Sequence, residues 1–182
     1  MVGNIQNANL LGGWKFEFQS AEKMPQPLAS AFYKLFGDRL GCTYTPEYLV
    51  ATQVVNGINY MLIAKRTKLT SGGKELTDFV IVVINIPAGD IRGEKATVVS
   101  EKDATDFVLR DEIESGVKKA LEGFTGATHK PILELGAQVV KGVNYHFICE
   151  SRIVYPNAEP YLTRVSINNF QGNWTIVEIE KL

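Results

Sequence analysis

The 182-residue chain is 45% hydrophobic, which suits one compact domain or two small ones and excludes a disordered polypeptide. Nineteen Lys and Arg residues against twenty Asp and Glu residues leave a net charge of -1. The basic field that holds a nucleic acid is therefore missing, and we expect no such partner. The longest apolar runs fall far short of the roughly 20 residues of a membrane-spanning helix, so we expect no membrane partner either.

The two cysteines, Cys42 and Cys149, are too few for a disulfide scaffold or for a metal site of their own. His129 and His146 have no second metal ligand close to them in the sequence. We therefore expect no metal and no cofactor. The first residues lack a basic stretch followed by an apolar one, so no signal peptide is visible. The protein either stays inside the cell or has lost a leader, and the localisation remains open.

The sequence repeats itself at an offset of 85 residues. The segment 53–60, QVVNGINY, returns at 138–145 as QVVKGVNY, with six identities in eight positions. The same offset aligns Gly41 with Gly126 without a gap. A repeat of this length predicts two copies of one structural unit.

Each copy, residues 1–103 and residues 104–182, is expected to contain one amphipathic helix. Apolar side chains recur with helical spacing in both copies, as Leu28, Phe32, Leu35 and Phe36 and as Ile113, Val117, Ala120 and Leu121. We predict the helices over about residues 27–40 and 106–124. Gly41 and Gly126 are the expected stop signals.

After each helix, alternating apolar and polar residues predict an antiparallel meander. In the first copy, Tyr48, Val50, Thr52 and Val54 are expected on one face of a strand. Asn56 and Gly57 then form a two-residue hairpin turn. A second hairpin is expected through residues 87–90 and, in the second copy, through residues 171–172. We therefore predict an α+β fold, in which each copy packs one helix across a four- to five-stranded antiparallel sheet.

The pattern Gln-x-Val-x-Gly in a hairpin that follows a helix, with a glycine ahead of that helix, resembles the cystatin and stefin family of cysteine-protease inhibitors. The pattern is present twice, as Gln53, Val54, Val55, Asn56 and Gly57 and as Gln138, Val139, Val140, Lys141 and Gly142. The resemblance extends over nearly the whole chain. It implies two tandem cystatin-like domains and a reversible, tight-binding inhibitor of papain-like cysteine proteases. It also implies that the helix and first strand can be exchanged between chains through the first hairpin, which would give a domain-swapped oligomer.

In this family the inhibitory edge has three parts, which enter the protease cleft as a wedge. The resemblance assigns these parts to the N-terminal segment at Gly12 and Gly13 and to the first and second hairpin loops. In the second copy it adds Trp174, whose alternative role is to pack at the edge of the sheet. No glycine precedes the second helix, so inhibition is expected mainly from the first copy.

Other functions remain open at this point. The Gln-Val-Val-x-Gly hairpin is also compatible with ordinary strand residues and a turn glycine, which leaves a non-inhibitory protein-binding module as the alternative. An enzyme would need an acid or a base inside a pocket. The helix faces that turn toward the sheets show no recurring Asp, Glu or His, so we do not expect an enzyme.

Overall fold

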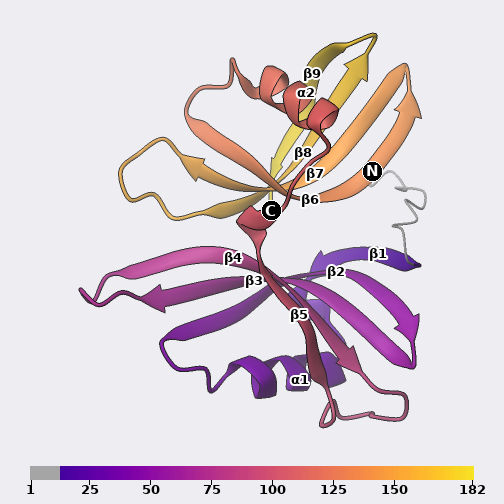
Figure 1. Cartoon of the computed structure of the whole chain (residues 1–182), viewed down its shortest axis with the longest axis vertical. Coiled ribbons are helices and arrows are strands. Elements are labelled where there is room, and N and C mark those ends of the chain that lie inside the picture. Colours follow the sequence, from indigo (N-terminus) through magenta and orange to yellow (C-terminus); the bar gives the residue numbers. More distant parts are fainter. Residues whose placement is uncertain (1–12) are drawn as a thin grey trace. The chain divides into compact units, whose positions relative to one another are not determined.

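The computed structural model describes residues 13–182, which divide into two compact units between Asp103 and Ala104. We call residues 13–103 unit one and residues 104–182 unit two. The described residues form two α-helices and nine strands in two antiparallel sheets, so the fold is α+β as predicted (Figure 1). Within this part of the chain, no helix is long and apolar enough to cross a membrane.

Unit one has a five-stranded sheet with one helix across its face (Figure 1). Strand β1 (Trp14–Ser20) leads through a single 3-10 turn into α1 (Gln26–Phe36). The other strands are β2 (Cys42–Val55), β3 (Gly57–Leu69), β4 (Glu75–Ile86) and β5 (Thr97–Asp103), and the sheet order follows the chain. Leu28, Phe32 and Phe36 on α1 form the core with residues of β2, β3 and β4.

Unit two has the same plan with one strand fewer. A 3-10 turn (Ala104–Asp106) precedes α2 (Asp111–Leu121), and the strands are β6 (Ala127–Val140), β7 (Gly142–Ile153), β8 (Tyr161–Phe170) and β9 (Asn173–Lys181). These four strands pair in chain order. Ile113 and Val117 on α2 pack against Phe147, Val165 and Ile167 on the sheet.

The 85-residue offset holds in the structure down to irregularities of the backbone. It places α1 on α2 and β2 on β6 without a shift of either boundary. The pairing of β2 with β3 has a bulge between Leu49 and Ala51, and the pairing of β6 with β7 has one between Glu134 and Gly136. A bulge adds one unpaired residue and bends the strand. Both copies of the sequence therefore bend their longest strand at the same place.

These bulges correct one expectation about β2. Tyr48 and Thr52 were expected to share a face with Val50 and Val54. Tyr48 pairs with Ile63 and Thr52 pairs with Tyr60, so their side chains lie on opposite faces of the sheet. The expected alternation of faces was wrong here because it does not allow for the extra residue that a bulge inserts.

Both helices are shorter than predicted. α1 ends at Phe36 rather than near residue 40, because Gly37 already closes the last turn onto Tyr33. α2 begins at Asp111 rather than near residue 106, since Arg110 has an extended backbone with ψ 140°. Just before it, Leu109 is buried in the core of unit two. Apolar spacing alone does not separate such an extended core residue from a helical one.

Strand β1 was not predicted, and it has no counterpart in unit two. The offset carries β1 onto residues 99–105, most of which belong to β5, the last strand of unit one. The segment that would begin the second sheet thus completes the first. As a result, no strand within residues 13–182 pairs with the outer edge of β6.

Candidate functional site

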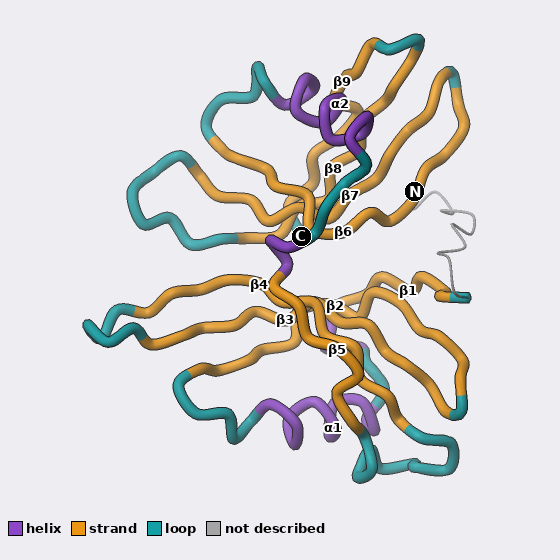
Figure 2. Tube along the Cα trace, in the orientation of Figure 1, coloured by secondary structure: helices purple, strands orange, loops and turns teal. Residues whose placement is uncertain are grey.

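Three segments of unit one lie together at one end of its sheet. Trp14, the first residue of β1, pairs with Gln53 near the end of β2. Gly57 lies against Ile86 and Pro87, where the loop from β4 to β5 begins. Figure 2 shows the β2–β3 turn and the β4–β5 loop at the same end of the unit. We call this surface tip one: Gly13 and Trp14, residues 54–57 and residues 87–91.

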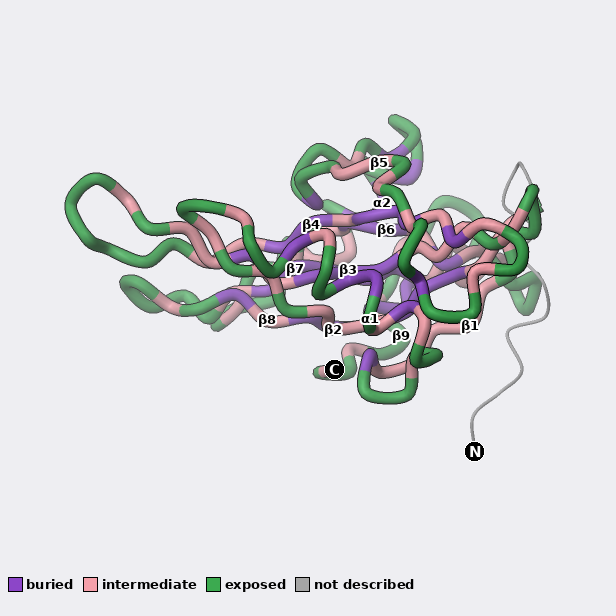
Figure 3. Tube along the Cα trace, turned by 90° about the horizontal axis from the view of Figure 1, so that it is seen from below, coloured by how far each residue is buried: buried purple, intermediate pink, exposed green. Residues whose placement is uncertain are grey.

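Tip one presents apolar side chains to solvent. Val54 is 84% exposed, Val55 is 45% exposed and Ile91, on the other loop, is 81% exposed. Figure 3 shows the hairpin turns largely in the colour of exposed residues. Gly13 is exposed with a φ of +75°, and Gly12 lies outside the described residues. Val54, Val55 and Ile91 thus give tip one apolar surface that is open to a partner.

A small cavity of about 190 Å³ lies between the two loops of tip one. Its walls include Ile58, Tyr60, Ile86 and Ile91. The loop beside it is fixed by Asp90, whose carboxylate accepts backbone N–H groups of Glu94 (3.1 Å) and Lys95 (2.7 Å). Desolvation alone would raise the pKa of Asp90, but these backbone donors hold it below its usual value. The β4–β5 loop is therefore preformed.

The structure shows a local reason for glycine at position 57. A Cβ atom built on it would lie 2.2 Å from the carbonyl oxygen of Ile86, and its φ is +112°. Gly142 repeats this arrangement, 2.3 Å from the carbonyl oxygen of Asn169. Both glycines are required by the contact between two loops of their own unit.

Gln53 takes part in a ladder of side-chain amides across three strands. Asn59 Nδ2 donates to Gln53 Oε1 (2.9 Å), and Asn85 Nδ2 donates to Asn59 Oδ1 (2.8 Å). In unit two, Asn168 Nδ2 donates to Asn144 Oδ1 (2.7 Å). These bonds tie the first hairpin to the neighbouring strand. They give a structural reason for a glutamine beside the turn in the first copy.

Unit two has a corresponding surface, tip two, formed by residues 139–142 and 170–172. Val139 is 85% exposed and Val140 is 44% exposed, as their counterparts in tip one are. Lys141 differs, because its ammonium group lies 5.1 Å from the ring centroid of Phe170. This cation–π contact places a positive charge at the turn.

Trp174 lies next to tip two and packs toward the core of unit two. Its indole stacks on Tyr145 with centroids 5.5 Å apart and packs against the core of unit two. A Cβ atom on Gly116 of α2 would lie 2.1 Å from the indole ring. The half-buried indole is therefore held under the helix, as the packing alternative required, and is not presented at the tip.

The structure also gathers polar residues that the sequence did not connect. His129 Nδ1 lies 2.7 Å from Ser151 Oγ, which lies 2.7 Å from Thr163 Oγ1. Ser151 is completely buried, so its hydroxyl cannot meet a substrate as a nucleophile. The three residues lie on three different strands, and only the pairing of β6, β7 and β8 brings them together.

Both cysteines are free thiols. Burial raises the pKa of Cys149 to about 12, which keeps it a thiol at neutral pH. Cys42 is half-buried. No group of three or more His, Cys, Asp or Glu side chains that could hold a metal occurs among residues 13–182.

Neither known protein families nor curated proteins gave a match to this sequence. The function must therefore be inferred from the two tips.

Proposed function

We propose that the chain is a reversible inhibitor of papain-like cysteine proteases and that tip one is its principal inhibitory surface. The meeting of Gly13, the β2–β3 turn and the β4–β5 loop at one end of a single sheet carries this proposal. The arrangement resembles the three-part wedge of the cystatin and stefin family, and that resemblance supplies the class of partner. We also propose that both units are cystatin-like domains.

The physical case rests on exposed apolar surface held in a fixed shape. Burial of Val54, Val55 and Ile91 in a cleft would gain about 25 cal/mol per Å² of apolar area. The amide ladder at Gln53 and the contact of Gly57 with Ile86 fix both loops before binding. Little conformational entropy is then lost on association, so the contacts convert efficiently into affinity.

The mode of inhibition follows from the shape of tip one. Its leading elements are turns that double back, with antiparallel strands on either side. A protease of this class cleaves an extended segment that lies along its cleft. A turn that enters the cleft end-on covers the nucleophile without placing a peptide bond in register, so the complex remains reversible.

We propose that tip two inhibits more weakly, for two reasons. The strand that precedes α2 is β5, which is paired within unit one, so tip two has no segment that corresponds to Gly13 and Trp14. Lys141 must also find an acidic partner or lose affinity through desolvation. Losing one of three contact segments corresponds to roughly two or three decades of affinity, about 3 to 4 kcal/mol.

The test is inhibition of active papain by the full chain, measured with three matched variants. Val54→Glu places a charge on the exposed turn of tip one, and Val139→Glu does the same on tip two. Leu40→Glu is the control, because Leu40 is 99% exposed in the connection between α1 and β2. We expect Val54→Glu to raise the inhibition constant at least about tenfold (~1.4 kcal/mol) and the other two variants to change it by less than about threefold.

Two results would count against the proposal. Unchanged inhibition by a folded Val54→Glu variant would remove the β2–β3 turn from the inhibitory surface. Complete absence of inhibition at micromolar concentration would leave the tips as surfaces for a non-inhibitory protein partner.

A further inference from the structure

The outer edge of β6 lacks the cover that the equivalent strand has in unit one. β2 is covered by β1, which pairs with β2 between residues 48 and 53. The equivalent positions on β6 are residues 133–138, and no strand of the described chain pairs with them on that side. Unpaired backbone N–H and C=O groups along such an edge are a template for another strand.

We propose that residues 133–138 of β6 bind an extended segment of another protein, which adds as an antiparallel strand in the place that β1 occupies in unit one. Main-chain hydrogen bonds supply the affinity in this mode of recognition, and alternate side chains supply the specificity. The inference is independent of protease inhibition, since it rests on the missing strand and not on the tips.

Unit one contains a template for this complex. In the pairing of β1 with β2, the register shifts between Phe16 and Gln19, opposite the bulge between Leu49 and Ala51. β6 has the same bulge between Glu134 and Gly136. A regular strand would lose register at this point, so the site selects a segment that can bulge as β1 does.

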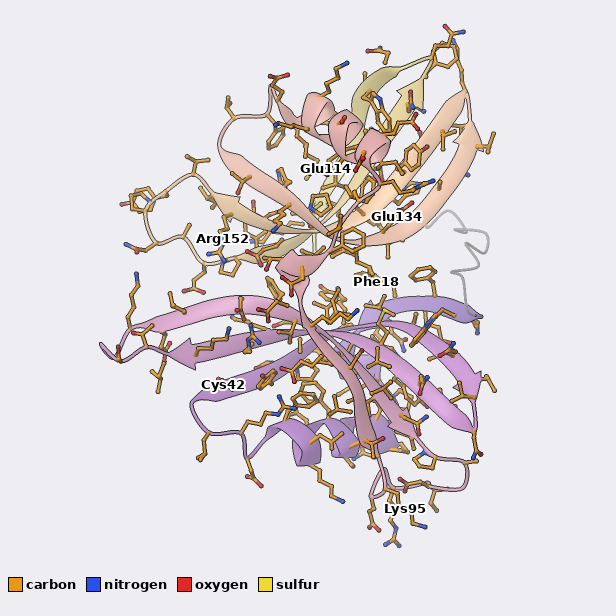
Figure 4. The ribbon with its side chains drawn as sticks, in the orientation of Figure 1. Phe18, Cys42, Lys95, Glu114, Glu134 and Arg152 are labelled. Atoms are coloured by element: carbon orange, nitrogen blue, oxygen red, sulfur yellow. The ribbon has the colours of Figure 1, made fainter. Side chains whose placement is uncertain are left out.

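The charge at the site defines the partner further. Gln19 of β1 pairs with Leu49, which is completely buried. Glu134, which Figure 4 labels, takes the place of Leu49 in unit two and is only half-buried. A basic residue opposite Glu134 would make a favourable cross-strand pair. We therefore expect apolar residues at alternate positions, as in β1, and a Lys or Arg where β1 has Gln19.

The sequence of β6 itself favours a covered edge. Sheets with permanently exposed edges protect them with charged residues, prolines or bulges. The start of β6 has such protection in Lys130 and Pro131. From residue 132 to residue 140, Glu134 is the only charged residue and there is no proline, so apart from its bulges this part of the edge is open to a partner.

The test uses the full chain and a synthetic peptide with the sequence of residues 13–20, carrying the change Gln19→Lys. Amide hydrogen exchange is followed at residues 133–138 and, as an internal control, at residues 48–53 of β2. We expect the peptide to slow exchange at residues 133–138 alone. The unaltered peptide should bind about threefold more weakly, and a peptide with Gln19→Glu more weakly still. A peptide of scrambled order should have no effect.

A charge reversal in the protein makes the test specific. Glu134→Lys should invert the order of the peptide affinities, so that the Gln19→Glu peptide binds better than the Gln19→Lys peptide. An unchanged order would overturn the proposal, as would failure of every peptide to slow exchange. Within residues 133–138, only the amides that do not bond to β7 report on the outer edge. Protection of these amides before peptide is added would also overturn the proposal. Protection independent of protein concentration would mean that the chain covers its own edge, and protection that rises with concentration would mean that a second copy does.

Discussion

The two units differ in the interactions that surround the start of β2 and the start of β6, the strand that follows the helix in each unit. In unit one this region is held by ion pairs. Arg66 is buried and donates to both carboxylate oxygens of Asp78 (2.8 and 2.7 Å) and to Asp103 (2.6 Å). Arg39 lies 4.4 Å above the ring of Phe36 and donates to Glu101 (2.5 Å).

Unit two uses neutral groups at the matching positions. The offset of 85 places Ser151 where unit one has Arg66 and His129 where it has Tyr44. Their hydrogen bonds carry no net charge when the imidazole is neutral. Beside them lies a cavity of about 650 Å³, whose walls are formed by α2, the segment before it and the start of β6. The same fold can therefore link the strands in this region by charge pairing or by neutral hydrogen bonds, and the two kinds of link should break under different conditions.

The largest contrast is expected when the buried arginine is removed. Arg66→Met leaves Asp103 without its cation and Asp78 with Lys68 alone, and breaking a buried pair costs about 3 kcal/mol even after allowance for the partial exposure of the carboxylates. Ser151→Ala in unit two should cost only about 1 kcal/mol. Urea unfolding, with hydrogen exchange to assign each transition to a unit, measures both. Equal costs would show that charge does not distinguish the two units.

A somewhat smaller effect is expected at the turn glycine of tip one. Gly57→Ala forces a Cβ atom toward the carbonyl oxygen of Ile86 and should destabilise unit one by about 2 to 3 kcal/mol. Gly73→Ala is the matched control, because Gly73 also has a positive φ (+73°) but has open space around it, so about 1 kcal/mol is expected. If both variants unfold at the same urea concentration, the loop contact is not what requires Gly57.

The amide ladder should contribute less to the free energy of unfolding than Gly57 does. Asn59→Ala removes bonds to both Gln53 and Asn85 in unit one, whereas Asn144→Ala removes the bond to Asn168 in unit two. We expect losses of about 1 kcal/mol or slightly more for the first variant and about half of that for the second. Thermal unfolding of each variant provides the measurement, and a larger loss for Asn144→Ala would contradict the assignment.

The mildest difference concerns acid. Burial lowers the pKa of His129 and His146 in unit two. The unfolded chain therefore binds protons more readily, so unit two is fully stable above about pH 6.5 and loses stability as the pH falls through the lowered folded pKa values. In unit one, desolvation would raise the pKa of Asp78, but the hydrogen bonds and charges of Arg66 and Lys68 together outweigh it and lower the pKa. That contribution is complete above about pH 3.9 and is lost only below it.

Exchange rates of core amides in each unit, measured from pH 7 to pH 4, test this order of acid sensitivity. His129→Phe should remove part of the acid sensitivity of unit two and leave unit one unchanged. Simultaneous loss of protection in both units would contradict the contrast.

Local sequence signals predicted the parts of this fold that depend on short-range geometry. The turns at Gly57 and Gly142 follow from residues that tolerate positive φ, and the repeat then doubles every inference. The helices were predicted from the spacing of apolar residues, and the hairpins from these turn residues. The ends of the helices were missed because Gly37 and Arg110 stop them through backbone geometry that apolar spacing does not encode.

Contacts between distant residues could not be derived in the same way. The proximity of Gly57 to Ile86, the burial of Trp174 under Gly116 and the contact of His129 with Ser151 all require the sheet to be assembled first. One signal was available: the alternation Trp14, Phe16, Phe18 is the pattern of a strand, and it could have revealed β1.

β5 is the last strand of unit one and also lies where the repeat would place the first strand of unit two. This has a consequence for how such a protein can lengthen by duplication. A whole unit of the first kind has five strands, yet copying 85 residues adds only four, because the copied stretch begins inside a strand that the preceding unit already uses. The sequence repeat thus encodes one strand fewer than a complete unit of the first kind contains. A gene that grows by repeating this step encodes a shorter chain for each added unit. The first strand of each added sheet then has an unpaired outer edge, which another segment must cover.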